Sequence, residues 1–289
     1  MNYRKSKLSP GIWFVGVPIG TARDITLRAL DVLASADVLV AEDSRSLRKL
    51  MDIHAIPLDG RRIEVLHDHS KDATVARLVE KAQEASIAYA SEAGMPGIAD
   101  PGFELARAAH LAGVTVTSAP GPSAVITAIA SAGLPTDAFL FGGFLPSARG
   151  AREKALQAHK DVPATLAYYE SPKRLAVMLR SAATVLGADR QAAVCRELTK
   201  RFEEIRSGPL EALADHYAGA SVKGEIVVLI SRATPRHLND SEIDSALRSA
   251  LCDMSVKDAA AFVAQSCDIP RRRAYQRALE LDRGTVPDT

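Results

Sequence analysis

Short apolar segments alternate with amphipathic ones along most of this chain, and several of the apolar segments end in a loop rich in glycine and proline. Gly11–Val17 runs into Pro18-Ile19-Gly20, and Val114–Ala119 runs into Pro120-Gly121-Pro122-Ser123. Short segments that are apolar throughout are typical of strands buried on both faces of a sheet. Strands that alternate with helices predict an α/β fold with largely parallel sheets.

The same pattern gives the expected elements. Strands are predicted at Gly11–Val17, Val38–Ala41, Ile87–Ala90, Val114–Ala119, Thr165–Tyr169, Ala192–Cys195 and Ile226–Ile230. Helices are predicted where apolar residues recur every three or four positions. One is capped by Asp24 and carries Leu27, Leu30 and Leu33 on one face, and another carries Val75, Leu78, Val79 and Ala82 on one face. Three more are predicted at Phe103–Ala112, at Ala124–Ala132 with Ser123 as its cap, and at Pro172–Leu186.

The 289 residues are enough for two domains with sizeable cores and a small appendage. We expect one α/β domain over 11–122, a second α/β domain over 123–235, and a small helical module over 238–289. The glycine- and proline-rich stretch 133–146 is interpreted as a boundary between two runs of the strand–helix pattern. In the helical module the strands stop, and amphipathic helices are predicted at Val256–Gln265 and Arg271–Leu281.

Composition excludes several classes of protein. The formal net charge is +1, which argues against a basic nucleic-acid coat or an acidic tail, and aromatic residues make up 5%, which disfavours recognition mainly by base stacking. Cys195, Cys252 and Cys267 are too far apart for a disulfide framework or zinc spacing, so a reducing cytosol is expected. The chain has no apolar run long enough to span a membrane.

Loops at strand ends are where ligands bind in open α/β sheets, so the glycine- and proline-rich loops predict a preformed small-molecule site. Ordinary strand-to-helix turns are the alternative for any single loop. No G-x-G-x-x-G loop, P-loop or G-x-S-x-G elbow occurs, which disfavours a nicotinamide dehydrogenase, a P-loop NTPase and an α/β-hydrolase. His67-Asp68-His69 lacks a third ligand at a known spacing, so no metal is predicted.

Charged residues also gather at the strand ends. A strand-end carboxylate can act as a general base, hold a positive centre, or cap a helix; these carboxylates are Glu42, Asp43, Glu92, Glu170 and Glu197. Basic residues follow the same strand ends, at Arg45, Lys173, Arg174 and Lys200. A basic rim around a small-ligand site suits a phosphate-bearing substrate such as RNA, although each basic cluster alone is more often a solvated face.

Nine motifs occur in an order that is similar to one known family. They are Pro18-Ile19-Gly20 with Asp24-Ile25-Thr26 and Arg28-Ala29-Leu30, Ala41-Glu42-Asp43-Ser44-Arg45, Ser91-Glu92-Ala93-Gly94-Met95-Pro96 with Asp100-Pro101-Gly102, Pro120-Gly121-Pro122-Ser123-Ala124, Gly133-Leu134-Pro135-Thr136-Asp137, Gly143-Phe144-Leu145-Pro146, Tyr169-Glu170-Ser171-Pro172 with Arg174-Leu175, Arg196-Glu197-Leu198-Thr199-Lys200 and Lys223-Gly224-Glu225. From about Gly11 to Ile230 the chain resembles the ribosomal RNA small subunit methyltransferase I family of the tetrapyrrole-methylase-like superfamily. It departs from the usual pattern at Thr21-Ala22, Leu47, Glu92 and Met95.

The resemblance implies S-adenosylmethionine as methyl donor and the 2′-hydroxyl of a decoding-site cytidine of 16S rRNA, in the small ribosomal subunit, as acceptor. It also implies two α/β domains with the cofactor in a cleft between them, a cytoplasmic homodimer, and no metal or membrane partner. The expected cofactor-binding residues are Ser91, Glu92, Ala93, Gly94, Pro96, Ile98, Pro120, Ser123, Ala124 and Tyr169. The expected catalytic residues are Glu42, Asp43 and Glu197, and the expected RNA contacts are Pro18, Gly20, Arg45, Lys200, Arg273 and Arg277.

Two alternatives stay open: a tetrapyrrole C-methyltransferase on the same scaffold, and a non-catalytic ribosome-binding protein. The basic strand-end residues and the helical module argue against the first, and the intact Ala93-Gly94 and Pro120-Gly121-Pro122-Ser123 loops argue against the second. Arg273 and Arg277 are four residues apart and share one face of a predicted helix, whereas Ala274, Ala278 and Leu281 lie on another face that can pack inward. We expect the arginines to contact rRNA; a helix that packs in a dimer or against a domain is the alternative.

Overall fold

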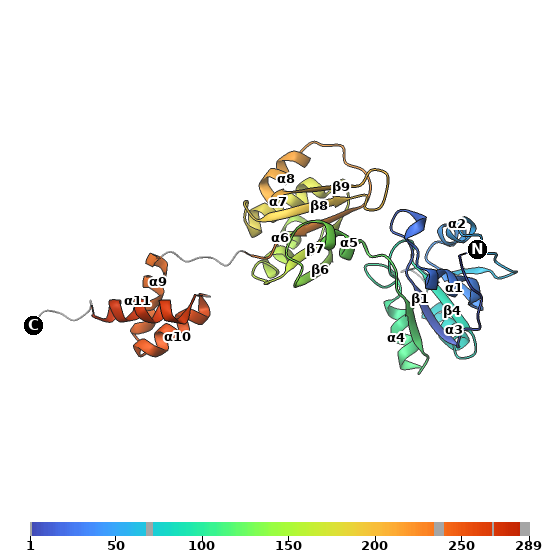
Figure 1. The fold of residues 1–289 in the computed structure, drawn as a ribbon, viewed down its shortest axis with the longest axis horizontal. Coiled ribbons are helices and arrows are strands. Elements are labelled where there is room, and N and C mark those ends of the chain that lie inside the picture. The colour runs from blue at the N-terminus through green and yellow to red at the C-terminus, as the bar shows by residue number, and fades with distance from the viewer. Residues whose placement is uncertain (1, 68–71, 234–239, 268, 284–289) are drawn as a thin grey trace, which may run out of the picture. The chain divides into compact units, whose positions relative to one another are not determined.

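The structure is a computed structural model, and it describes residues 2–67, 72–233, 240–267 and 269–283. The chain forms two compact units, Met1–Arg232 and Ala233–Thr289. The first unit holds two five-stranded sheets, one built from β1–β5 and the other from β6–β10 (Figure 1). The domain boundary expected between residues 122 and 123 stays a prediction, since both sheets belong to one compact unit.

The first sheet is parallel throughout, as the strand–helix alternation predicts. Its strand order is β3 (Ile63–Val65), β2 (Val38–Ala41), β4 (Ser86–Ala90), β1 (Gly11–Val15) and β5 (Val116–Ala119). Helices α1 (Leu27–Ser35) and α2 (Ser44–Ile53) pack on one face, and α3 (Asp72–Lys81) and α4 (Phe103–Leu111) pack on the other. Both faces are therefore covered, which is why β4 is buried along its whole length.

The start of α1 differs from the prediction. Thr26, not Asp24, caps the helix, because its side chain accepts a hydrogen bond from the amide of Ala29 at 3.1 Å. Asp24 instead ends a short 3₁₀ helix, η1 (Ala22–Asp24). Asp43 caps α2, a helix that we did not predict. At the carboxyl end of β2, Glu42 is therefore followed directly by the N-cap residue of α2.

The second sheet is mainly antiparallel, so the prediction of largely parallel sheets was wrong here. Its strand order is β6 (Phe139–Phe144), β7 (Thr165–Glu170), β10 (Ile226–Ile230), β8 (Gln191–Arg196) and β9 (Glu204–Pro209), and only β6 and β7 pair in parallel. Residues 197–203 join β8 to β9, a connection too short for a parallel crossover. The stretch 133–146, interpreted as a boundary, contains the edge strand β6.

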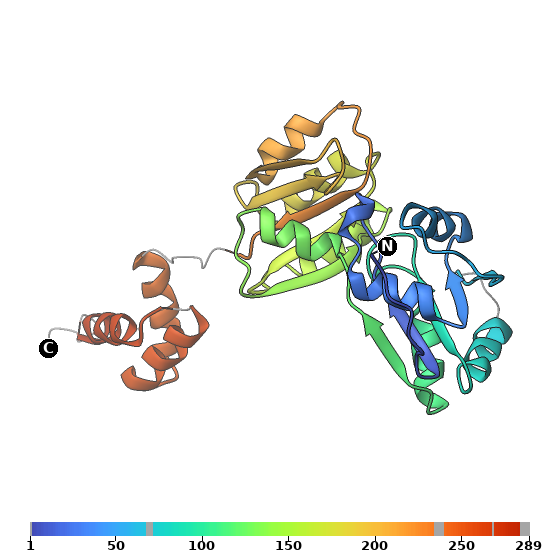
Figure 2. The same cartoon turned by 45° about the vertical axis from the view of Figure 1, so that its right-hand side comes forward.

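Helices also cover both faces of the second sheet. Helix α5 (Ala124–Ser131) packs on one face, and α6 (Arg149–Ala158), α7 (Leu175–Leu186) and α8 (Leu210–Tyr217) pack on the other (Figure 2). Tyr169 of β7 faces α5, and its neighbour Tyr168 points into the core on the opposite side. This alternation brings Tyr169 to the side of the sheet that borders the candidate site.

The second unit consists of α9 (Asp240–Leu251), α10 (Val256–Ser266) and α11 (Arg271–Arg283) around a small core of their own. Ala274 and Ala278 of α11 are fully buried in it and Leu281 packs against it, which confirms the predicted inward face. Among the residues that the structure describes, every helix is too short or too polar to cross a membrane.

Candidate functional site

A cavity of about 360 Å³ lies where loops from the first sheet meet strand ends of the second. Ile19 follows β1, the segment Ala93–Asp100 follows β4, and Ser123 follows β5. The carboxyl ends of three parallel strands therefore line it, as expected for an α/β ligand site. Tyr169 and Glu225, from the second sheet, complete the wall. The volume is in the range of small-molecule pockets.

Glycines let these loops approach one another closely. A Cβ on Gly16 would lie 2.6 Å from the backbone of Gly121, so the loops after β1 and β5 touch only because both positions lack a side chain. Gly94 has a φ of +72°, and it exchanges backbone hydrogen bonds with Val17 at 2.9 and 3.1 Å. The loop after β4 is thereby tied to the end of β1.

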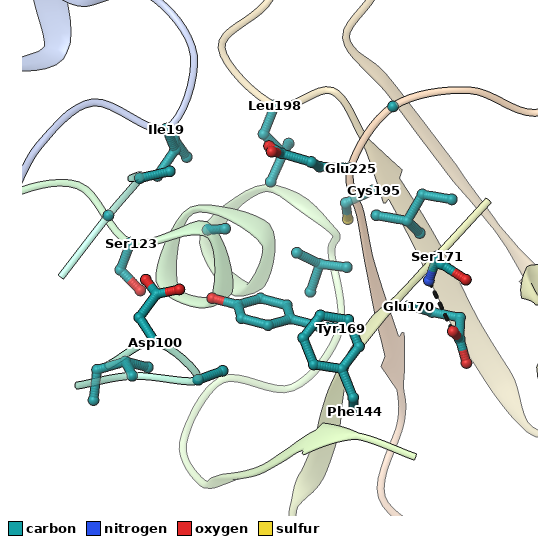
Figure 3. A pocket seen from close by; sticks show the side chains of 18 of the residues that line it. Ile19, Asp100, Ser123, Phe144, Tyr169, Glu170, Ser171, Cys195, Leu198 and Glu225 are labelled. Atoms are coloured by element: carbon teal, nitrogen blue, oxygen red, sulfur yellow. Dashed lines mark hydrogen bonds between the residues drawn. The ribbon is translucent and has the colours of Figure 1, made fainter. Parts of the chain in front are cut away.

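An aromatic cluster forms the opposite wall. The Tyr169 ring packs edge-on against Phe141, with centroids 5.0 Å apart, and against Phe144 at 5.5 Å. Burial, and secondarily the charge of Asp100, raises the pKa of Tyr169. Its phenol is therefore neutral and keeps a proton to donate. Figure 3 shows the Tyr169 hydroxyl, the Asp100 carboxylate and the Ser123 hydroxyl pointing toward the same part of the cavity.

Ser123 occupies the N-cap position of α5, but among the described residues its side chain makes no capping hydrogen bond. The prediction that this residue caps the helix is correct in position and wrong in the interaction. The hydroxyl points toward the cavity instead (Figure 3). A polar group that is released from capping can bind a ligand.

A charged network holds the wall at the start of β10. The Lys200 ammonium donates to Glu197 at 3.0 Å and to Glu225 at 2.8 Å, and the Glu197 carboxylate accepts the Glu225 amide at 3.0 Å. That amide, with further help from Lys200, lowers the pKa of Glu197. A Cβ on Gly224 would lie 2.4 Å from the Glu197 carboxyl, so the carboxylate fits beneath a glycine. Glu197 thus holds the backbone of a cavity-lining segment.

The carboxylates after β2 make local contacts. Glu42 accepts the backbone amide of Glu92 at 3.2 Å and so links the ends of β2 and β4. Asp43 accepts the amide of Arg45 at 2.8 Å and its guanidinium at 3.1 Å, and the Arg45 side chain lowers the pKa of Asp43. The Arg45 side chain is 91% exposed. In the described part of the chain, Glu42, Asp43 and Glu197 do not line the cavity.

The structure brings six of the ten expected cofactor-binding residues to the cavity: Ala93, Gly94, Ile98, Ser123, Ala124 and Tyr169. The other four are not among the described residues that line it: Ser91, Glu92, Pro96 and Pro120. Two of these support the wall from behind. The Ser91 hydroxyl donates to the Ala93 carbonyl at 3.2 Å, and the Pro120 carbonyl accepts the Thr26 hydroxyl at 3.2 Å.

The expected RNA contacts lie in three places. Pro18 and Gly20 follow β1, and a Cβ on Gly20 would lie 2.4 Å from the Thr199 hydroxyl, so this loop packs on the segment that carries Lys200. Arg45 lies exposed in the first turn of α2, whereas Lys200 is paired with two carboxylates. Arg273 and Arg277 lie on α11 in the second unit and bind carboxylates of α9.

Five polar or ionisable residues that line the cavity were not among the expected cofactor-binding, catalytic or RNA-contacting residues: Asp100, Glu170, Ser171, Cys195 and Glu225. Asp100 belongs to one of the motifs that carry the resemblance, but the sequence pattern assigned it no role. Glu225 precedes a strand, whereas the pattern that predicts site residues concerns those that follow strands. Because β10 is antiparallel to β7 and β8, its first residue pairs with the last residues of both, Glu170 and Arg196. Antiparallel pairing therefore brings Glu225 to the edge of the sheet at which β7 and β8 end.

No group of three or more potential metal ligands occurs within the described ranges. Two residues of the His67-Asp68-His69 segment lie outside them.

Comparisons with known proteins agree with this geometry. A family model described as Tetrapyrrole (Corrin/Porphyrin) Methylases matches residues 11–214, and one described as RsmI C-terminal HTH domain matches residues 238–282. Among solved structures, diphthine synthase is similar with a TM-score of 0.60 and 16% identity, covering 76% of this chain and 89% of that one. Uroporphyrin-III-C-methyltransferase from Thermus thermophilus is similar with a TM-score of 0.55 and 20% identity, covering 78% and 95%.

Curated relatives are more similar in sequence. The Mesorhizobium japonicum protein named ribosomal RNA small subunit methyltransferase I is 44% identical over 276 residues, which cover 95% of this chain and 93% of the relative. The Vibrio cholerae protein of the same name is 39% identical, covering 94% and 95%. With this identity over nearly the whole length, and with the tetrapyrrole methylase match from β1 to β9, the chain belongs to the ribosomal RNA small subunit methyltransferase I family of the tetrapyrrole methylases.

Proposed function

We propose that this chain methylates the ribose 2′-hydroxyl of a decoding-site cytidine of 16S rRNA, with S-adenosylmethionine as donor. The observation that carries the proposal is the cavity at the strand ends, in a chain whose relatives are named rRNA small subunit methyltransferases. The target nucleotide and its 2′-oxygen come from the resemblance in sequence. The methyl donor is the one that tetrapyrrole methylases use.

The residues of the cavity fit this donor. When bound, S-adenosylmethionine supplies an activated methyl group on a positively charged sulfur. The carboxylate of Asp100 lines the cavity and complements positive charge, whereas that of Glu225 is already paired with Lys200. Tyr169 and Phe144 offer an apolar surface, and the Tyr169 and Ser123 hydroxyls can donate or accept hydrogen bonds. Gly94 keeps the backbone close to a ligand without a side chain in the way.

The protein's chemical task is to orient the ribose and remove its proton. Orientation of two reactants can supply about 7–11 kcal/mol of a barrier, and a positioned base about 10²–10⁴-fold in rate. Of Glu42, Asp43 and Glu197, we place Glu42 first as the base. Asp43 accepts both the amide and the guanidinium of Arg45, and Glu197 accepts the Lys200 ammonium and the Glu225 amide, so a cation engages each of these two carboxylates. Glu42 accepts the neutral amide of Glu92.

The proposed RNA contacts near the cavity are Pro18, Gly20, Arg45 and Lys200. Arg45 is the more accessible of the two cations, because the ammonium of Lys200 is shared between Glu197 and Glu225. An exposed guanidinium can bind a phosphate through two parallel hydrogen bonds. We therefore assign Arg45 the larger share of phosphate binding.

We further propose that the enzyme works in the cytoplasm as a homodimer. Light scattering on the purified protein tests the dimer: a mass of about 62 kDa is expected, twice the 30.8 kDa of one chain, and a single-chain mass would refute it.

The experiment that tests the proposed function offers labelled S-adenosylmethionine with three acceptors: small ribosomal subunits, free 16S rRNA, and a porphyrinogen. We expect label in rRNA of the small subunit. Transfer to the porphyrinogen alone would favour a tetrapyrrole C-methyltransferase. Donor binding by calorimetry without transfer to any acceptor would favour a protein that binds but does not catalyse.

A further inference from the structure

The arginines at the start of α11 fall into two groups with different partners. Arg277 binds the Asp244 carboxylate through two nitrogens, at 2.6 and 2.8 Å, and Arg273 binds Asp240 at 2.7 Å. Both partners belong to α9, so these two arginines hold α11 against α9 inside the second unit. The guanidinium groups that we expected to face RNA are therefore largely engaged in the module's own structure.

Arg271 and Arg272 form no ion pair with another described residue, and both are exposed. On α11 they lie one turn before Tyr275, at spacings of four and three residues, so the three side chains share one flank of the helix. Lys257 and Ala260 lie three apart on α10 and face that flank. Together these five residues line a shallow groove between the two helices, which we call the α10–α11 groove.

The chemistry of the α10–α11 groove suits a polyanion that also carries planar rings. Three cations line it, and none of its described lining residues is acidic. Paired guanidinium groups match phosphate oxygens, and an exposed ring such as that of Tyr275, which is 43% accessible, can stack on a base.

We propose that the α10–α11 groove binds the phosphate backbone of the substrate RNA away from the reacting nucleotide, with Lys257, Arg271 and Arg272 as the contacting cations. The inference rests on the proposed function, because it takes rRNA as the substrate. It assigns Arg273 and Arg277 a structural role. The groove adds affinity for RNA and takes no part in donor binding or methyl transfer.

The test compares two full-length variants that each remove two positive charges. Arg271→Gln/Arg272→Gln alters the groove, and Lys154→Gln/Arg248→Gln removes exposed cations from α6 and α9. Binding to small ribosomal subunits is measured over a series of salt concentrations. The slope of log affinity against log salt falls by about 0.7–0.9 for each phosphate that a cation no longer neutralises, so the slope for the groove variant should be smaller by about 1.4–1.8. We expect its affinity to fall about 25- to 60-fold near 0.1 M salt, because log affinity changes by 1.4–1.8 over the tenfold range from 1 M salt, with an unchanged slope for the control.

Two further measurements keep the result unambiguous. Calorimetry should give wild-type affinity for S-adenosylmethionine in the groove variant, and thermal unfolding should be unchanged because the altered side chains are exposed. Lys257→Gln on α10 should lower the salt slope by about 0.7–0.9 on its own. If wild type methylates subunits but the groove variants bind them with unaltered affinity and slope, the inference is overturned and the proposed function stands. An equal loss of affinity in the control would also overturn it. Failure of the wild type to methylate rRNA would refute the proposed function itself.

Discussion

Gly224→Ala should destabilise the first unit by more than backbone strain alone. Gly224 has a φ of +94°, a conformation that costs a residue with a side chain about 1–2 kcal/mol. The added Cβ would also lie 2.4 Å from the carboxyl carbon and one oxygen of Glu197, so the carboxylate must move. Lys200 can follow it, but the hydrogen bond from the Glu225 amide breaks, at a cost of about 1.5–3 kcal/mol for a bond to a charged group. The expected destabilisation is about 2.5–5 kcal/mol in total.

Gly219→Ala is the matched control. Gly219 has a similar φ of +74°, but a Cβ there meets no atom within 4 Å in the described structure, so only strain is added and the destabilisation should be about 1–2 kcal/mol. Urea unfolding followed by the fluorescence of Trp13, the single tryptophan, reports on the first unit. In a Glu197→Ala background, Gly224→Ala should cost no more than Gly219→Ala. Equal destabilisation by Gly224→Ala and Gly219→Ala in the wild-type background would refute this account of the wall.

Three other predictions concern the same site. Tyr169→Phe keeps the ring contacts and removes one hydroxyl, so calorimetry should show donor affinity reduced about threefold to tenfold, as for one neutral hydrogen bond; unchanged affinity would mean that the hydroxyl does not touch the donor. Glu42→Gln should lower kcat about 10²–10⁴-fold with donor affinity retained, and near-normal turnover would exclude Glu42 as the base. The folded-state pKa of Glu197 is lowered, so the ionised side chain stabilises the fold at pH values above the usual range of a glutamate pKa. This stabilisation is lost as pH falls through the lowered pKa. The urea midpoints of wild type and Glu197→Gln should therefore differ at pH 7 and converge in acid.

The first sheet could be predicted from sequence because its signal is local. Val38–Ala41 is apolar throughout and is observed as a strand with the same bounds, and β4 and β5 differ from prediction by one or two residues. The short edge strand β3 (Ile63–Val65) and the partly exposed β9 (Glu204–Pro209) lack that apolar signal, and both were missed. The direction of β10 was also missed, since its sequence reads the same in a parallel or an antiparallel sheet.

The residues of the candidate site likewise fall into those that the sequence predicts and those that it does not. Gly94 and Ser123 could be found because parallel strands bring the residues after them to one edge. Glu225 depended on the direction of β10, which only the folded sheet reveals. The partners of Arg273 and Arg277 depended on α9, a helix whose contact with α11 no local spacing on α11 encodes. The chemical character of the site could thus be predicted from its residue types, whereas the ion-pair partner of each charged side chain could not.

Alkaline hydrolysis of the methylated rRNA tests whether the methyl group is transferred to a ribose oxygen of 16S rRNA. Cleavage of RNA by base needs a free 2′-hydroxyl, so a 2′-O-methyl group protects the adjacent bond. After incubation of small ribosomal subunits with the enzyme and S-adenosylmethionine, we expect one new protected position, at a decoding-site cytidine, that is absent without donor. Label incorporated into rRNA with no protected position would place the methyl group on a base and refute the proposed ribose methylation.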